Sequence, residues 1–284
     1  MFNKSENKTQ LLLKLSNFLE SNNIENFKEE SQIMISYACK EENFINVQSK
    51  KIDKDILESI VNQRLTGKPL SKIIKQKGFW NHIFITDENT LDPRADSEII
   101  IENILKDLSI SNLKDYLFVD LCCGTGCLGI SILHELKNAH CDFIDISKKA
   151  ISVCQENILN IEVKNRSITY VSDLFSNYPL DRLKDVKFII CNPPYIPSNH
   201  YFKLNKETLY DPKIALDGGE HGTSFYFKVI NFLIKIKFKG DIYFEIDPII
   251  NEKLQKFLLE KRVKIVYKKP DYLNLDRLIK VTLP

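Results

Sequence analysis

The run Val186–Cys191 and the tetrapeptide after it constrain the fold most. The run is short, apolar and rich in β-forming residues, which is typical of a strand buried on both faces of a parallel sheet. Asn192-Pro193-Pro194-Tyr195 follows directly. Proline fixes its own φ and keeps the preceding residue out of the α region. We therefore expect Asn192 on a stiff, extended segment at the carboxyl edge of the sheet, where open α/β sheets bind ligands.

Strands and helices alternate from residue 92 onward. Strands are predicted at 116–121, 141–144, 167–171, 186–191, 241–246, 263–267 and 278–283. Helices are predicted at 97–108, 128–136, 148–159 and 224–236, with a further one ending at 259. This alternation predicts the α/β class, with a doubly wound parallel sheet and helices on both faces.

The chain divides by pattern into three parts. Residues 1–75 form a small helical domain, because apolar stripes at helical spacing run from about 7 to 65 and Asp53 is a candidate N-cap. Residues 76–91 form a β-hairpin linker with its turn at Asn81-His82. Residues 92–284 form the α/β domain.

The tetrapeptide suits chemistry on a planar, weakly nucleophilic NH2 group. The lone pair of such a nitrogen is delocalised, and two acceptors aimed at its N–H bonds would partly localise it. The side-chain oxygen of Asn192 and the backbone carbonyl of Pro193 are candidate acceptors. Tyr195 offers an aromatic face to the amide and to a sulfonium methyl donor, and Pro194 completes the wall. The alternative is a proline-rich turn that ends a core strand.

Three further features follow successive predicted strands and describe a nucleoside pocket. The first is the loop Asp120-Leu121-Cys122-Cys123-Gly124-Thr125-Gly126, whose glycines allow a tight turn and close approach to a ligand. The second is Asp145, placed to bind ribose hydroxyls, and the third is Asp173 with Leu174, for an adenine ring. The loop lacks the third glycine of a dinucleotide-binding fingerprint, and no phosphate-binding G-K-[ST] is present, so S-adenosyl-L-methionine fits best.

Each of these carboxylates has a structural alternative. Asp145 could cap the next helix in competition with Ser147, Asp120 could tie down the loop backbone, and Asp173 could begin an Asx turn.

Composition excludes several other classes. The formal net charge is only +2, so we expect no direct nucleic-acid binding. The spacing Cys122-Cys123-x3-Cys127 invites a metal interpretation, but these residues lie in a glycine-containing turn, and we expect small buried thiols and no metal. No signal peptide and no 18-residue apolar span is seen, so we expect a cytoplasmic protein that does not contact the membrane.

The motifs together resemble the N5-glutamine methyltransferases of peptide chain release factors, over nearly the whole chain. Besides the loop, Asp145 and the tetrapeptide, the resemblance rests on signature segments elsewhere. These are Arg64-x2-Gly67-x-Pro69, Pro93-Arg94-x2-Ser97-Glu98, Asp211-Pro212-x2-Ala215-Leu216 and Asp271-x4-Asp276-Arg277.

The resemblance implies a seven-stranded methyltransferase sheet with its last strand antiparallel, a helical domain that recognises substrate, and transfer to the glutamine of a Gly-Gly-Gln loop. It implies that residues 122–126, Asp145 and Leu174 line the donor, and that residues 192–195 hold the glutamine amide. Arg94 is a weaker substrate candidate, with an ion pair to Glu98 as the alternative. We expect a monomer.

Two features depart from the family pattern. Two other activities also stay open. Cys122 stands where the family has glycine, which matters if that position needs a positive φ. Glu245-Ile246-Asp247-Pro248 replaces the usual Glu-x-Gly. The alternatives are methylation of a ribosomal protein's glutamine, or of an exocyclic base amine in RNA or DNA.

Overall fold

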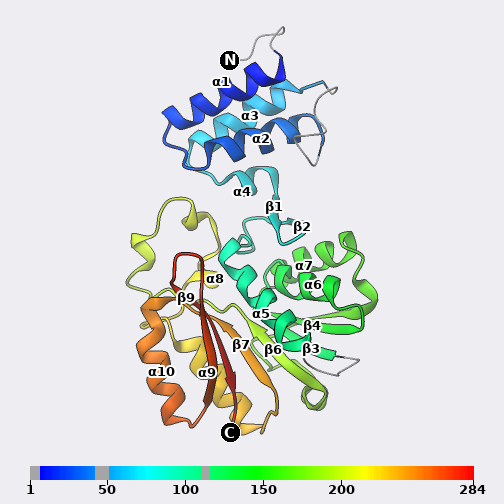
Figure 1. Cartoon of the computed structure of the whole chain (residues 1–284), viewed down its shortest axis with the longest axis vertical. Helices are drawn as coiled ribbons and strands as arrows, with labels where there is room; N and C mark the ends of the chain where they lie inside the picture. The colour runs from blue at the N-terminus through cyan, green and yellow to red at the C-terminus, as the bar shows by residue number, and fades with distance from the viewer. Residues whose placement is uncertain (1–6, 42–50, 110–115) are drawn as a thin grey trace. The chain divides into compact units, whose positions relative to one another are not determined.

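The computed structural model describes residues 7–41, 51–109 and 116–284, and it divides into two compact units, residues 1–75 and 76–284 (Figure 1). Part of the predicted helical stretch, residues 42–50, lies outside the described residues.

The first unit is helical, as predicted. Its helices are α1 (Lys8–Ser21), α2 (Phe27–Ala38), α3 (Lys54–Leu65) and the short α4 (Leu70–Ile74). Leucine, isoleucine and methionine side chains at helical spacing form its core, among them Leu15, Leu19, Met34 and Leu57. Asp53 caps α3 by accepting a hydrogen bond from the backbone N of Ile56 at 3.1 Å, which confirms the predicted cap.

Arg64 of the first signature segment holds this unit together. Its side chain is buried, its Nε lies 2.7 Å from a carboxylate oxygen of Glu30 on α2, and its Nη1 lies 3.4 Å from the carbonyl of Lys68. A buried arginine needs such partners, because an unpaired buried charge is costly. The signature arginine thus joins α2, α3 and the turn before α4.

The second unit contains a seven-stranded sheet in the order β5-β4-β3-β6-β7-β9-β8. The strands are β3 (Tyr116–Leu121), β4 (Ala139–Asp145), β5 (Ser167–Val171), β6 (Val186–Cys191), β7 (Asp241–Glu245), β8 (Lys264–Pro270) and β9 (Asp276–Thr282). The pairs from β5 to β7 are parallel, whereas β9 runs antiparallel to both β7 and β8. The predicted seven strands and antiparallel last strand are confirmed.

Helices cover both faces of the sheet (Figure 1). One apolar layer contains α5 (Glu98–Ser109), α6 (Cys127–Glu135) and α7 (Lys148–Asn160). The other contains α9 (Ser224–Lys235) and α10 (Asn251–Glu260). Shorter elements are α8 (Lys213–Leu216), η2 (Ala95–Ser97), η3 (Lys164–Arg166), η4 (Leu180–Lys184), η5 (Tyr201–Lys203), η6 (Thr208–Tyr210) and η7 (Pro248–Ile250). No helix within the described ranges is long and apolar enough to cross a bilayer.

The hairpin belongs to the second unit, and its turn lies one residue earlier than predicted. Strands β1 (Gln76–Phe79) and β2 (His82–Ile85) pair Phe79 with His82, so the turn is Trp80-Asn81. Trp80 adopts a φ of 53°, its backbone N donates to Glu98 on α5 at 2.7 Å, and its indole N donates to Glu135 on α6 at 2.8 Å. These contacts, distant in sequence, fix the turn.

Close packing of α6 on the sheet requires glycine at position 129. A Cβ atom there would lie 2.5 Å from the ring of Phe143 and 2.8 Å from a carboxylate oxygen of Asp120. Both neighbours are buried and have little room to move.

We therefore predict that Gly129→Ala lowers the free energy of unfolding by about 1 to 3 kcal/mol, because it overpacks this contact. Chemical denaturation would measure the change. Gly78→Ala is the matched control, since a Cβ at Gly78 meets nothing within 4 Å. Equal stability of the two variants would contradict the packing argument.

Candidate active site

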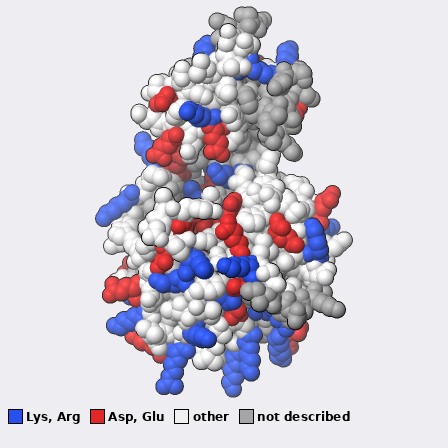
Figure 2. Space-filling view, viewed as in Figure 1, with Lys and Arg blue, Asp and Glu red and all other residues white. Residues whose placement is uncertain are grey.

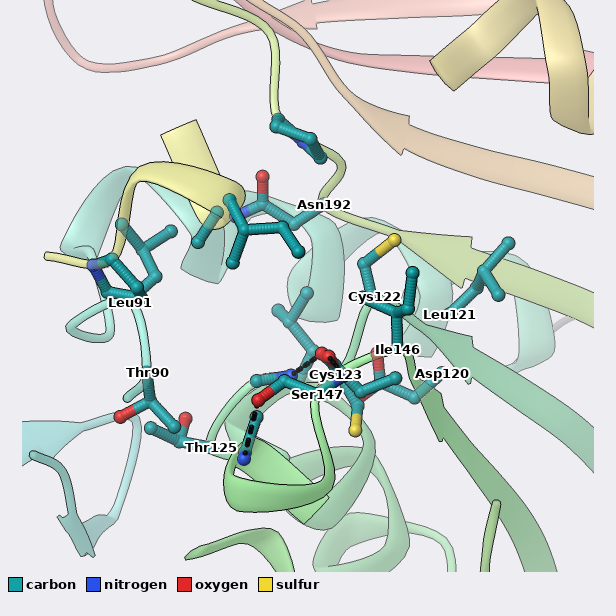
Figure 3. A pocket seen from close by; sticks show the side chains of 18 of the residues that line it. Thr90, Leu91, Asp120, Leu121, Cys122, Cys123, Thr125, Ile146, Ser147 and Asn192 are labelled. Atoms are coloured by element: carbon teal, nitrogen blue, oxygen red, sulfur yellow. Dashed lines mark hydrogen bonds between the residues drawn. The ribbon is translucent and has the colours of Figure 1, made fainter. Parts of the chain in front are cut away.

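Two adjoining pockets open at the carboxyl ends of the central strands. The first, here the loop pocket, is lined by the loop after β3, the ends of β4 and β5, and the start of the tetrapeptide (Figure 3). The second, here the outer pocket, is lined by Tyr195, Glu245, Arg277 and several residues of the segment from 196 to 208. Leu91, Arg94, Asn192 and Ala215 line both. Asn192 therefore stands where the two pockets meet.

Asp145 anchors the loop after β3. Its carboxylate accepts hydrogen bonds from the backbone N of Gly124 at 3.0 Å and of Ser147 at 2.8 Å. The hydroxyl of Ser147 caps α7 by accepting from the backbone N of Ala150 at 3.2 Å, so the capping role considered for Asp145 belongs to Ser147. Burial raises the pKa of Asp145, and these backbone donors oppose that shift. A carboxylate has further lone pairs, so Asp145 can still accept from a ligand.

Asp120 lies near the end of β3, and its carboxylate bonds to α6 and not to the loop backbone. It is buried and accepts from the backbone N of Gly129 at 2.9 Å. Burial raises the pKa of Asp120 to about 7, against the opposing effect of that hydrogen bond. Asp120 also lines the loop pocket, so its structural role and a binding role are compatible.

Cys122 occupies a left-handed backbone position, with φ of 61°. Such a φ costs an L-residue free energy that glycine does not lose. A contact with the thiol of Cys191 and burial raise the pKa of the Cys122 thiol. Cys123, Gly124 and Thr125 line the loop pocket beside it (Figure 3).

Gly126 adopts a φ of 78° at the start of α6. The cysteines of the loop are free thiols, and the described part of the chain holds no group of three potential metal ligands.

The segment after β5 contributes Ser172 and Leu174 to the loop pocket. Asp173 is exposed and does not line the pocket. Leu174 has a φ of 50°, a turn conformation that places the two neighbours of Asp173 on the pocket wall.

The end of the tetrapeptide is held by backbone contacts with residues 216–222. The backbone N of Ile196 donates to Leu216 at 2.9 Å, and that of Gly218 donates to Ile196 at 2.8 Å. A Cβ at Gly222, where φ is 71°, would lie 2.2 Å from the carbonyl oxygen of Tyr195. The backbone is therefore held tightly from both sides.

The four side chains of the tetrapeptide face different surroundings. Asn192 lines both pockets, Pro194 lines the loop pocket and Tyr195 lines the outer pocket. Pro193 is buried and lines neither pocket.

Arg94 pairs with Asp211, at 2.6 Å, and the considered ion pair with Glu98 does not form. Asp211 also accepts from the backbone N of Asp92 at 3.2 Å, so two signature segments far apart in sequence meet beside Asn192. Glu98 instead accepts from the backbone N of Trp80. Burial of Asp211 explains the choice, because a buried carboxylate requires a cation or donors.

Sequence reasoning missed two buried polar residues behind Asn192. Ser97 and Glu245 hydrogen-bond to each other, and the side-chain N of Asn192 lies 3.5 Å from the hydroxyl of Ser97. Glu245 ends β7 as Asn192 follows β6, and that shared position at the carboxyl edge was the available signal. Burial raises the pKa of Glu245 to about 7, against hydrogen bonding from Ser97 and the charge of Arg277.

Arg277 gathers the acidic residues around the outer pocket. Its guanidinium lies 2.8 Å from Asp247, 2.9 Å from Asp271 and 3.7 Å from Asp96. Asp247 also caps η7 by accepting from the backbone N of Ile249 at 2.9 Å. The departure from Glu-x-Gly thus supplies a cap and an ion pair.

Comparisons with known proteins find methyltransferases. A family model described as methyltransferase small domain matches residues 88–217. A release factor glutamine methyltransferase of Leptospira interrogans is 32% identical over 72% of this chain and 73% of its own length. One of Flavobacterium psychrophilum is 31% identical over 79% of each chain, and one of Clostridium acetobutylicum is 28% identical over 94% of this chain and 95% of its own.

A solved structure shows the same fold at low sequence identity. The catalytic domain of hMettl16, in complex with a MAT2A 3'UTR hairpin, has a TM-score of 0.56 and 11% identity, over 71% of this chain and 77% of that chain.

We predict that Cys122→Val makes the protein about 1 to 2 kcal/mol less stable than Cys122→Gly, because a branched side chain fits a positive φ poorly and glycine fits it freely. Thermal or chemical unfolding of the two variants measures this difference. A valine variant as stable as the glycine variant would argue against backbone strain at this position.

We also predict that stability falls as pH rises from about 4 to about 7. The pKa values of Asp120 and Glu245 are both raised to about 7, from ordinary values of 3.8 and 4.5. Over that range the folded protein keeps protons that the unfolded chain releases, so rising pH favours unfolding. Denaturation at several pH values would show a shallower fall for Asp120→Asn. If the free energy of unfolding changed with pH equally in the variant and the wild type, Asp120 would not be a cause of the fall.

Proposed function

Because this chain belongs to the release factor glutamine methyltransferase family, we propose that it methylates the side-chain amide nitrogen (N5) of the glutamine in the Gly-Gly-Gln loop of a peptide chain release factor. The seven-stranded sheet is that of class I methyltransferases. The observation that carries the proposal is the position of Asn192, at the end of a buried strand and on the wall of both pockets.

The loop pocket suits S-adenosyl-L-methionine. Asp145 would accept from the ribose hydroxyls while it keeps its two backbone donors, and Leu174 with Ile146 would contact the adenine. Residues 122–126 supply a tightly turned backbone against which the rest of the donor would lie, and Asp120 lies behind them. No phosphate-binding loop competes with this assignment. When bound, this donor supplies an electrophilic methyl group on a sulfonium.

The outer pocket would receive the glutamine side chain. The Asn192 oxygen, on the wall of both pockets, and the Pro193 carbonyl, between the lining residues Asn192 and Pro194, would accept from the two N–H bonds of its amide, which localises the nitrogen lone pair for attack. Tyr195 would cover the planar amide, because it lines this pocket directly after the prolines. The rigid tetrapeptide would hold both acceptors in place before the substrate binds. Positioning of the substrate would therefore contribute much of the rate enhancement.

We propose that the substrate is a protein and that the reaction takes place in the cytoplasm. Arg94 lines both pockets while paired with Asp211, so it can contact the substrate backbone near the target residue. We propose residues 1–75 as a recognition domain for the release factor and residues 92–284 as the catalytic domain, with residues 76–91 as a connecting hairpin that packs with the catalytic domain. We propose a monomer.

An enzyme for exocyclic base amines is less well supported. Such an enzyme extrudes its target from a stack and tracks phosphates with a basic surface. On the face shown in Figure 2, acidic and basic side chains are interspersed over most of the second unit, and the net charge is +2. Methylation of a ribosomal protein's glutamine needs the same site, so only a substrate test separates it.

We predict that the purified protein, with S-adenosyl-L-methionine, adds one methyl group to the Gly-Gly-Gln glutamine of a release factor. Peptide mass spectrometry would locate it. A factor with that glutamine changed to alanine is the control. Donor binding without any methylated factor would redirect the search to ribosomal proteins and RNA.

We predict that Asn192→Ala lowers kcat/KM by at least about a hundredfold, because one of the two acceptors for the reacting amide is lost. Donor affinity, measured by calorimetry, stays largely unchanged, since Asp145 and the loop after β3 are intact. Near-normal turnover by this variant would overturn the role given to the tetrapeptide.

A further inference from the structure

The amide of Asn192 must point its oxygen, not its nitrogen, at the reacting NH2 group. Rotation of the amide by half a turn would present two donors to a group that itself carries two donors. Such a reversal changes the shape of the side chain very little. Packing alone therefore does not choose the productive orientation, and hydrogen-bond partners behind the amide must do so.

Those partners are Ser97 and Glu245. Ser97 ends η2 and is 2% exposed, and Glu245 ends β7 and is 3% exposed. The Ser97 hydroxyl hydrogen-bonds to Oε2 of Glu245, and Nδ2 of Asn192 lies 3.5 Å from the Ser97 oxygen. Ser97 lines the loop pocket and Glu245 lines the outer pocket, but each is so little exposed that water has limited access to these contacts.

The donors and acceptors in the hydrogen-bond series Asn192–Ser97–Glu245 follow from the number of hydrogens that each group carries. A serine hydroxyl has a single hydrogen, and an ionised carboxylate only accepts. Once the Ser97 hydrogen is directed to Glu245, the Ser97 oxygen can only accept from its other neighbour. That neighbour is Asn192, so its NH2 faces Ser97 and its oxygen faces away.

We propose that Ser97 and Glu245 are positioning residues that hold the Asn192 amide with its oxygen toward the substrate. This inference rests on the proposed function, because it assumes that Asn192 accepts from the glutamine amide. The reversed amide would place two acceptor oxygens together, in a buried place where an unmet polar contact is costly.

The ionisation of Glu245 decides whether the hydrogen bonds from Asn192 to Ser97 and from Ser97 to Glu245 keep this donor-to-acceptor order. A protonated Glu245 can donate to Ser97, and Ser97 could then donate to the Asn192 oxygen. Several ionisable groups lie near enough to Glu245 for electrostatic interaction to shift the pKa of Glu245 or their own pKa. They are Arg277 on β9, Asp96 in η2, Tyr195 after β6, Cys127 at the start of α6 and Tyr226 on α9. Arg277 favours the ionised form and Asp96 opposes it, while burial places the pKa near neutrality.

Ser97→Ala tests the orientation directly. We expect kcat to fall about tenfold, as for the loss of one buried hydrogen bond to a polar network, with donor affinity and melting temperature close to wild type. Ser131→Ala is the matched control, because Ser131 is also a fully buried serine but its hydroxyl has no hydrogen-bond partner in the structure. We expect wild-type turnover from it.

Glu245→Gln tests the donor-to-acceptor order of these hydrogen bonds through the pH dependence of kcat/KM. Wild type and Ser131→Ala should lose kcat/KM as pH falls below about 7, because Glu245 becomes protonated. The glutamine variant has no such ionisation, so we expect this acidic limb to shrink to the part that Asp120, whose pKa is also about 7, contributes. A role in stability alone would leave the shape of the pH profile unchanged.

The outcomes separate the two proposals. Wild type that binds donor but methylates no release factor refutes the proposed function. Active wild type, with Ser97→Ala as active as Ser131→Ala, refutes only the positioning role. A Ser97→Ala variant that loses donor binding or melting temperature together with turnover would also refute it, as would an unchanged acidic limb in Glu245→Gln.

Discussion

The parallel pairing of β3 with β6 is the constraint on which the site depends. Leu121 pairs with Cys191, so the loop that begins at Cys122 and the tetrapeptide that begins at Asn192 leave the sheet side by side. A shift of the pairing by one residue would exchange the faces to which every side chain of β6 points. Four of the six residues of β6 alternate between two apolar layers that are both filled, so such a shift is strongly opposed. Core packing thereby sets the spacing between the two halves of the site.

Much of the fold could be predicted because its signals are local. The bounds of β3, β5 and β6 match the predicted ranges, since each is a compact β-rich run. The turn of the β1–β2 hairpin was misplaced by one residue, because contacts from Trp80 to α5 and α6 decide it. A turn determined by residues that far away carries no signal within its own sequence.

The candidate site was only partly predictable for the same reason. Asp145 and Asn192 could be named because each directly follows a predicted strand, and Asp120 because it stands next to the end of one. Glu245 also stands near the end of a predicted strand, but its meeting with Ser97 could not be predicted, because it depends on how η2 packs over the end of β7, 148 residues later in the chain. The ion pair of Arg94 with Glu98, considered as the alternative to a substrate role, does not form, because buried Asp211 requires a partner and Arg94 supplies it.

Sheet order has a consequence for the course of folding. Strand β9 follows β8 along the chain but lies between β7 and β8, so β8 has no neighbour in the sheet until β9 has inserted. Arg277 is on β9, and its partners Asp96, Asp247 and Asp271 come from three separate segments. Before insertion, these carboxylates would repel one another without a shared cation. The edge of the sheet and one part of the wall of the outer pocket therefore depend on the same strand, because a chain without β9 in place lacks Arg277 at that wall.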